Sequence, residues 1–371
     1  MKIIQFEWKK LWKSKAFIAF LLITVAIVAA LFTRNYFYQD IVKSKKVESF
    51  QEQSSNVIAT VNTDRKTLEE IGEGVDPTLE ENIELGLSLY QKLQELLAAV
   101  DADEDLSALQ LENDAYELAM QYISMQEGFR YPLTELEMQD EIKLNEELLQ
   151  KELPKEDLHA SIQPAVFMKQ VVQLLFNTFG FFILVVIIGT PIVKEFDDRT
   201  IKLSYGLPIS SRRLVLSKWL SMVLSGTTWF GLIMLTTYAI STVFGKEIAN
   251  PFEYPLYTEQ MTFMTSGEYV TQSIIYGLFY LIVLMSFFIF LSFLLKNTLV
   301  VHIVLLILFV INFMMTSNGL IHFALPWSYQ ELDQTVLLRE NASWIGAILS
   351  LVLTGVLLLF AVLSSKRREY R

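Results

Sequence analysis

The sequence predicts an all-α integral membrane protein with six transmembrane helices. Apolar residues make up 52% of its 371 residues and the mean hydropathy is positive, which is high for a soluble domain. Six stretches without charge are each long enough to cross a hydrocarbon core of roughly 30 Å as a helix. They do not alternate as barrel strands do, and backbone groups in lipid must bond within the segment. These stretches are residues 16–33, 170–193, 219–245, 269–295, 297–330 and 341–365.

The fifth stretch is too long for a single span. We therefore place its helix at 298–317 and treat the remainder as loop. Only Lys296 and Asn297 separate it from the preceding span, so these two spans should form a helical hairpin. The six predicted transmembrane helices are 16–33, 170–193, 219–245, 271–295, 298–317 and 342–363.

The charge distribution predicts the orientation. The segments on one side of the six spans hold 16 basic and 5 acidic residues, whereas the two short loops on the other side contain only Lys246 and Arg339 as basic residues. Because Lys and Arg accumulate on the cytoplasmic side, both termini should be cytoplasmic. The composition is typical of a bacterial plasma-membrane protein. The predicted cytoplasmic segments are 1–15, 194–218, Lys296 and the tail 364–371, and the short outer loops are 246–268 and 318–340.

Residues 1–15 predict an amphipathic helix that lies in the headgroup layer. Ile4, Trp8, Leu11 and Trp12 share one arc at helical spacing, and lysines occupy the opposite arc. A plain basic flank of the first span is the alternative. A cleaved signal peptide over residues 1–33 is another, although it has only a weak cleavage sequence.

Residues 34–169 predict an extracellular helical domain. This insert holds 12 basic and 29 acidic residues and carries three apolar stripes at helical spacing. One helix should begin at Asp76-Pro77, and another at Thr134 with a capping box to Glu137. Its acidity either keeps an external bundle soluble or favours cationic ligands.

Two further features concern the outer loop and the spans. The loop 318–340 contains Pro326 and Trp327 in a partly apolar context, which predicts a segment dipping into the outer membrane interface. His302 in the fifth span is expected to be buried with a partner or to face a pore. Asn177 and Asn312 could hydrogen-bond between helices.

The sequence contains no recognisable catalytic chemistry. It has no cysteine and no G-x-x-x-x-G-K-[ST], G-x-G-x-x-G, H-E-x-x-H or G-x-S-x-G motif. We therefore expect no catalytic residue, metal or cofactor on this chain, and no nucleic-acid partner. Any source of energy must lie on another polypeptide.

The segment 194–218, between spans two and three, packs six basic and three acidic residues into a short cytoplasmic stretch. Glu195 and Arg199 have the i, i+4 spacing of a helical ion pair. The segment reads E-F-D-D-R-T, then P-I-S-x-R, then a lysine before span three. This pattern resembles the permease subunits of ABC transporters of the type-2 exporter class, in the branch with a long insert after span one. The residues that carry the resemblance are Glu195, Thr200, Pro208, Ser210, Arg212 and Lys218.

The resemblance implies a transmembrane permease of an ATP-driven exporter that moves an amphipathic or lipophilic cargo such as a peptide, lipid or drug. ATP and Mg would be bound by a separate ABC ATPase subunit, and a second permease copy, identical or related, would complete the path. The segment would act as a coupling helix seated on the ATPase. Its coupling residues would be Glu195, Arg199, Thr200, Pro208, Arg212, Arg213 and Lys218, and Trp8, Trp12 and Trp219 would anchor the chain at the membrane interface.

A receptor or scaffold with a ligand-binding external domain and no transport is the alternative. It would work without ATP, but six spans exceed what an anchor needs. A membrane-embedded enzyme is disfavoured because the spans contain no pair of carboxylates and no His or Ser constellation.

Overall fold

The computed structural model describes residues 2–72, 77–126, 129–206, 208–246, 248–258, 262–320, 325–337 and 344–366. The chain divides into two compact units. One contains residues 1–32, 164–245 and 256–371, and the other contains residues 33–163 and 246–255.

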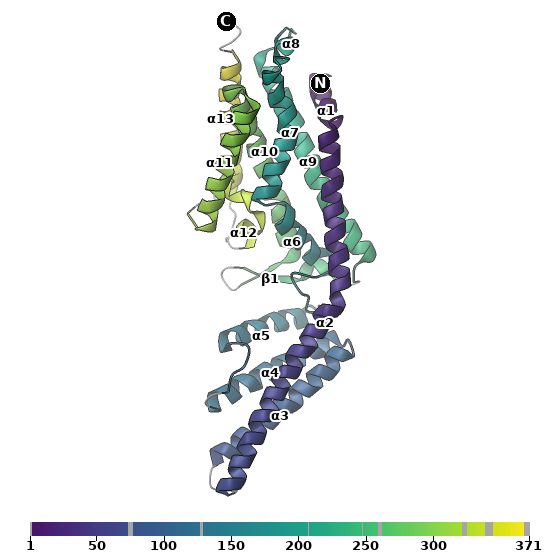
Figure 1. Ribbon diagram of the computed structural model, residues 1–371, viewed down its shortest axis with the longest axis vertical. Helices are drawn as coiled ribbons and strands as arrows, with labels where there is room; N and C mark the ends of the chain where they lie inside the picture. The colour runs from purple at the N-terminus through teal and green to yellow at the C-terminus, as the bar shows by residue number, and fades with distance from the viewer. Residues whose placement is uncertain are drawn as a thin grey trace. The chain divides into compact units, whose positions relative to one another are not determined.

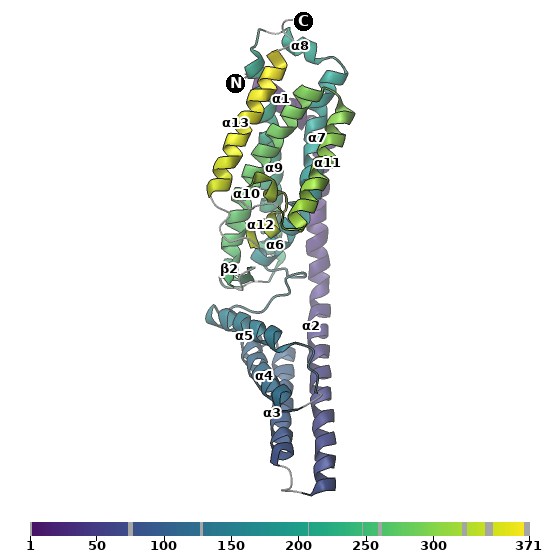
Figure 2. The ribbon, with the colours of Figure 1, turned by 90° about the vertical axis from the view of Figure 1, so that its left-hand side faces the viewer.

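Six helices are long and apolar enough to cross a membrane, which confirms the predicted all-α membrane fold. In the first unit these helices run side by side (Figures 1 and 2). In both views α1 (Lys2–Trp12) and α8 (Ile201–Tyr205) lie at one end of this bundle, and α12 (Leu332–Leu337) lies towards the other. The six are α2 (Lys15–Ile71), α7 (Thr178–Asp197), α9 (Ser211–Phe244), α10 (Ser266–Leu295), α11 (Thr298–Ser317) and α13 (Trp344–Lys366).

The second predicted helix, over 170–193, is not continuous. The structure has α6 (Pro164–Leu175) and α7, with a break at residues 176–177. The side chain of Asn177 accepts hydrogen bonds from the backbone N–H groups of Phe179 and Gly180, and its amide donates to Gln173 and Leu174 carbonyls. Asn177 therefore caps a new helix instead of bonding between spans, a role that hydropathy alone does not reveal.

Helix α2 continues far beyond its charge-free stretch. Residues 15–71 contain neither glycine nor proline, so nothing in the sequence interrupts the helix. It ends immediately before Gly72, which has a φ of 103°, a conformation that favours glycine. Residues 33–71 of this helix belong to the second unit.

The second unit is a helical bundle, as the apolar stripes predict. Helices α3 (Pro77–Asp101), α4 (Asp105–Met125) and α5 (Glu135–Gln150) enclose a core with residues of α2, including Val57 and Val61. The predicted capping box is present: Thr134 Oγ1 accepts from the Glu137 N–H at 3.3 Å, and the Glu137 carboxylate accepts from the Thr134 N–H at 2.8 Å. The predicted cap at Asp76 lies outside the described residues.

Short elements complete the outer loops. The region 246–268 contains a 3₁₀ turn, η1 (Pro251–Glu253), and the strands β1 (Pro255–Tyr257) and β2 (Phe263–Thr265) of a two-stranded sheet. The loop after α11 contains a 3₁₀ helix, η2 (Pro326–Gln330), followed by α12.

The α12 segment is fixed to the bundle of the first unit by polar contacts. The Asp333 carboxylate accepts a hydrogen bond from the Tyr269 hydroxyl at 2.8 Å and lies 3.7 Å from Lys169 Nζ. Glu331 accepts from the backbone N–H of Thr178 at 3.0 Å. These contacts join α12 and the residue before it to α6, α7 and α10. The membrane-dipping role of residues 318–340 stays a prediction.

Close packing joins α7 to α10. A Cβ added to Gly189 would lie 2.2 Å from Cζ of the Phe288 ring, far inside van der Waals contact. Glycine is therefore required at this position because the aromatic ring occupies the space of a side chain.

Candidate functional site

The predicted coupling segment 194–218 forms a helix–turn–helix arrangement at one end of the first unit (Figure 1). Helix α7 ends at Asp197, and Arg199 turns the chain with a φ of 57°. The short helix α8 follows. Helix α9 then begins with Ser210 as its N-cap, whose Oγ accepts a hydrogen bond from the Arg213 N–H at 3.4 Å. Leu207 lies outside the described residues.

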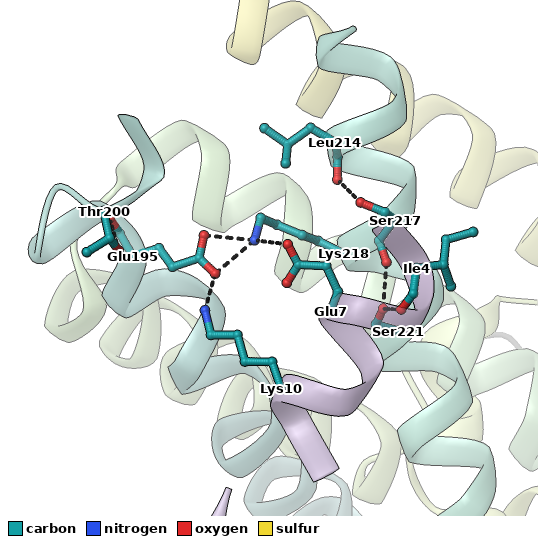
Figure 3. Close-up of polar contacts among 9 residues, drawn as sticks. All are labelled: Ile4, Glu7, Lys10, Glu195, Thr200, Leu214, Ser217, Lys218 and Ser221. Carbon is teal, nitrogen blue, oxygen red and sulfur yellow. Dashed lines mark hydrogen bonds and ion pairs between the residues drawn. The ribbon is translucent and has the colours of Figure 1, made fainter. Parts of the chain in front are cut away.

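A buried ion cluster joins the two ends of this segment to α1 (Figure 3). It is formed by Glu7, Glu195 and Lys218, with Lys10 at its exposed edge. Lys218 Nζ lies 2.9 Å from Glu7 Oε1, and 2.9 and 2.8 Å from the two carboxylate oxygens of Glu195. Lys10 also pairs with Glu195. The four side chains come from α1, α7 and α9, so the cluster joins three helices that are distant in sequence.

Burial makes this cluster consequential for structure. The Lys218 side chain is 0% exposed, and those of Glu7 and Glu195 are 8% and 9% exposed. The buried part therefore holds two carboxylates and one ammonium group, and the ammonium of Lys10, whose side chain is 40% exposed, pairs with Glu195 at the edge. Removing one partner of such a pair is far more costly than replacing the whole set with neutral groups, because it leaves an unpaired buried charge.

A hydrogen bond extends the contact between α1 and α9. Ser221 Oγ donates to the carbonyl oxygen of Ile4 at 3.4 Å, whereas Ser217 Oγ donates within α9 to the carbonyl of Leu214 at 2.9 Å (Figure 3). Together with the ion cluster, the Ser221–Ile4 bond fixes the position of α1 against the first turns of α9.

The predicted coupling residues separate into two sets. Glu195 and Lys218 are buried in the cluster, whereas the other five are exposed. Leu203 on α8 joins the exposed set, with 76% of its surface accessible. The exposed predicted residues are Arg199, Thr200, Pro208, Arg212 and Arg213.

The predicted ion pair between Glu195 and Arg199 is wrong. Helix α7 ends at Asp197, and the left-handed conformation of Arg199 takes it off the helical path that i, i+4 pairing requires. Glu195 instead pairs with Lys218 and Lys10 from other helices.

The segment is also connected to the remaining helices. The Asp197 carboxylate accepts a hydrogen bond from the backbone N–H of Thr298 at 3.1 Å, which links the end of α7 to the first residue of α11. The hydroxyls of Tyr205 on α8 and Ser365 on α13 lie 3.2 Å apart. The tight turn predicted at Lys296-Asn297 is present, with Asn297 capping α11.

The three predicted anchoring tryptophans differ in exposure. Trp8 is 36% exposed, whereas Trp12 and Trp219 are half-buried. Trp8 and Trp12 meet edge to face, with ring centroids 5.8 Å apart. Their role at a membrane interface stays a prediction.

Sequence reasoning missed Glu7, Lys10 and Asp197. The available signal was in α1: Glu7 is the single acidic residue of the basic stretch 1–15, and at helical spacing it lies beside Ile4 and Leu11 on the apolar arc. A lone carboxylate on an apolar face indicates a buried cationic partner. No sequence pattern identifies that partner as Lys218, which is 211 residues away.

A comparison with protein families gives an independent result. The family model described as "ABC-2 family transporter protein" matches residues 1–357. No curated protein and no solved structure matches the chain. The match covers nearly all of both compact units and agrees with the six candidate spans. The chain therefore belongs to the ABC-2 transporter family and is a multi-pass membrane permease of that family.

Proposed function

We propose that this chain is the permease subunit of an ATP-driven exporter and that residues 194–218 couple it to a separate ABC ATPase. ATP and Mg would bind to the ATPase, and a second permease copy would complete the translocation path. The family match supports the transport role. The arrangement of the segment supports the coupling role.

The buried ion cluster is the observation that carries this proposal. A force applied to α8 can move the helices on either side of it only if they are firmly connected. The Glu195–Lys218 pair joins the end of α7 to the beginning of α9, and Glu7 adds α1 to the same unit. A push on the segment would therefore move three helices together.

The exposed set provides the docking surface. Arg199, Arg212 and Arg213 present guanidinium donors, and none of them forms an ion pair with a described residue of the chain. Guanidinium groups suit the carboxylates of an acidic partner. Leu203 adds an exposed apolar side chain that a docked partner would cover.

The same proposal assigns the sides of the membrane. α1, α8 and the C-terminal end of α13 lie at one end of the bundle of the first unit in both views, and their basic residues would make this end cytoplasmic (Figures 1 and 2). The insert 34–169 would then be extracellular. The cargo would be amphipathic or lipophilic, because the candidate membrane spans contain few charged residues.

Co-expression with the products of the neighbouring genes, followed by co-purification, tests whether the chain recruits an ABC ATPase. The double variant Arg212→Glu/Arg213→Glu should weaken the complex by about tenfold or more, because it replaces two charge-assisted contacts with repulsion. The matched control Lys9→Glu/Lys13→Glu reverses two exposed charges within residues 1–15, outside the segment, and should leave the affinity within about twofold.

Two outcomes would contradict the coupling role. One is a wild-type chain that recruits no P-loop protein. The other is an Arg212→Glu/Arg213→Glu variant that keeps wild-type affinity and ATP-dependent transport while its thermal unfolding is unchanged.

A further inference from the structure

A cavity of about 280 Å³ lies between α10, α11 and η2 in the first unit, away from the coupling segment. Its volume is at the lower end of the range of ligand pockets in proteins. The lining residues are Tyr280, Leu284, Phe287, Leu308, Phe309, Ile311, Asn312, Met315, Trp327 and Gln330.

The cavity has a rigid floor and an accessible rim. Tyr280, Phe309 and Gln330 are at most 5% exposed, whereas Leu308 and Ile311 on α11 are 38% and 47% exposed. The floor is built into the bundle, and the rim lies on the surface of a transmembrane helix. A long apolar molecule can therefore reach the cavity from the side of α11.

The orientation of the Gln330 carboxamide is fixed by its partners. Its Nε2 donates to the carbonyl oxygen of Phe309 at 3.1 Å, which can only accept, and also to the hydroxyl of Thr178. Its Oε1 therefore faces Asn312 Nδ2, at 2.8 Å, and the Tyr280 hydroxyl, at 3.4 Å. Gln330 has no hydrogen-bonding atom left over for a ligand in this arrangement.

Asn312 differs from Gln330, because its side-chain oxygen Oδ1 can still accept a hydrogen bond. Its Nδ2 donates to the carbonyl of Trp327 at 2.8 Å as well as to Gln330, so both N–H groups are used and the orientation of the amide is fixed. Its Oδ1 then has no hydrogen-bond donor among the described residues. An acceptor left without a donor in an apolar environment costs free energy that a ligand can recover.

The chemistry of the lining selects the ligand. None of the ten lining residues is charged, so a charged headgroup would lose its hydration without compensation. We propose that this cavity binds a neutral amphiphile, with its apolar chain between α10 and α11 and a hydroxyl or amide N–H donated to Asn312 Oδ1. Both a membrane lipid and a transported molecule could supply this group, and the proposal does not depend on the ATPase partner.

Photolabelling of the full chain in lipid nanodiscs tests the site. The probes are a long-chain primary alcohol carrying a diazirine and its methyl ether, which has the same chain but no donor. Labelled residues are identified by mass spectrometry. The alcohol should label the rim at Met315 and Trp327, about fivefold more than the ether, the effect of one neutral hydrogen bond. In Asn312→Leu the two probes should label equally.

A pair of neighbouring variants tests the cavity itself. Leu308→Trp places an indole in the cavity and should reduce labelling about tenfold or more by steric exclusion. Ile307→Trp adds the same group one residue away, at an exposed position that does not line the cavity, and should leave labelling within about twofold. Competition by lipid extract or by transported compounds then distinguishes the two sources of ligand.

Three results would overturn the proposal. The first is equal labelling by alcohol and ether in the wild type, and the second is labelling unaffected by Leu308→Trp. The third is an absence of rim labelling, the result expected if a second copy of the chain covers α11. The comparison of the two probes uses wild-type protein and therefore does not depend on the folding of any variant.

Discussion

The ammonium of Lys218 lies within hydrogen-bonding distance of both carboxylate oxygens of Glu195, which places the last turn of α7 against the beginning of α9. The ion pair holds the end of α7 and the beginning of α9 together. Separating the two helices would leave buried charges unpaired or expose them to lipid or water. Because Glu7 binds the same ammonium, the N-terminal helix α1 is joined to these helices as well.

Replacement of Lys218 by methionine should destabilise the first unit by about 3–5 kcal/mol, because Glu7 and Glu195 remain buried without their central cation. The variant Glu7→Gln/Glu195→Gln/Lys218→Met removes all three buried charges of the cluster and should recover much of the lost stability. Thermal unfolding of the purified protein, with hydrogen exchange of α1 amides, measures both. A triple variant as unstable as Lys218→Met would refute the explanation by unpaired charge.

Asp197→Ala should cost about 1 kcal/mol locally, since it removes the acceptor for the first N–H of α11. The expected sign is faster hydrogen exchange at the N-terminus of α11, together with weaker coupling between ATP hydrolysis and transport. Asp198→Ala is the matched control, because its carboxylate is exposed and adjacent in sequence. Equal effects of the two variants would show that the α7–α11 contact has no special role.

Gly189→Ala should destabilise the protein by about 1–3 kcal/mol through overpacking against the Phe288 ring. Gly231→Ala in α9 meets no atom within 4 Å and should be neutral or slightly stabilising, because alanine favours the helix. Phe288→Leu combined with Gly189→Ala should restore part of the loss. Thermal unfolding compares the variants, and a neutral Gly189→Ala would show that α7 and α10 can separate at little cost.

The helical insert should become less stable in acid because the carboxylate of Glu112 becomes protonated. This carboxylate lies 2.7 Å from Lys155 Nζ and accepts from the Tyr116 hydroxyl at 2.9 Å. Burial alone would raise the pKa of Glu112, but the charges of Lys155 and Lys46 outweigh it and lower the pKa below its ordinary value of 4.5. A lowered folded-state pKa means that the stabilisation is present above pH 4.5 and is lost as the pH falls through the folded-state value.

Hydrogen exchange in α4 and α5 across this pH range measures the effect. Glu112→Gln should speed exchange at neutral pH, because it leaves the partly buried Lys155 with a single carboxylate partner, Glu141. The same variant should show a smaller loss of protection on acidification. An unchanged acid response in Glu112→Gln would assign the pH dependence to other groups.

Several features follow from local sequence patterns. The hairpin turn at Lys296-Asn297, the helix bounds of 298–317 and the Thr134–Glu137 capping box are predicted correctly because each depends on residues within a few positions of one another. The break between α6 and α7 was missed because Asn177 is a single polar residue in a long apolar run. Hydropathy averaged over such a run does not reveal that one residue caps a new helix. The Glu195–Arg199 pair was wrong because it assumes that α7 continues, whereas the helix ends two residues after Glu195.

The sequence by itself determined the six spans, the charge asymmetry of the loops and the position of the charged segment 194–218, because hydropathy and charge act along the chain residue by residue. Only the tertiary structure decided which charged residues of that segment are buried and which are exposed. It also decided that Asn312 has an open acceptor in an apolar cavity. Both depend on side chains that come from separate helices, and the free energy of burying a charge or a polar group is set by those neighbours rather than by adjacent residues.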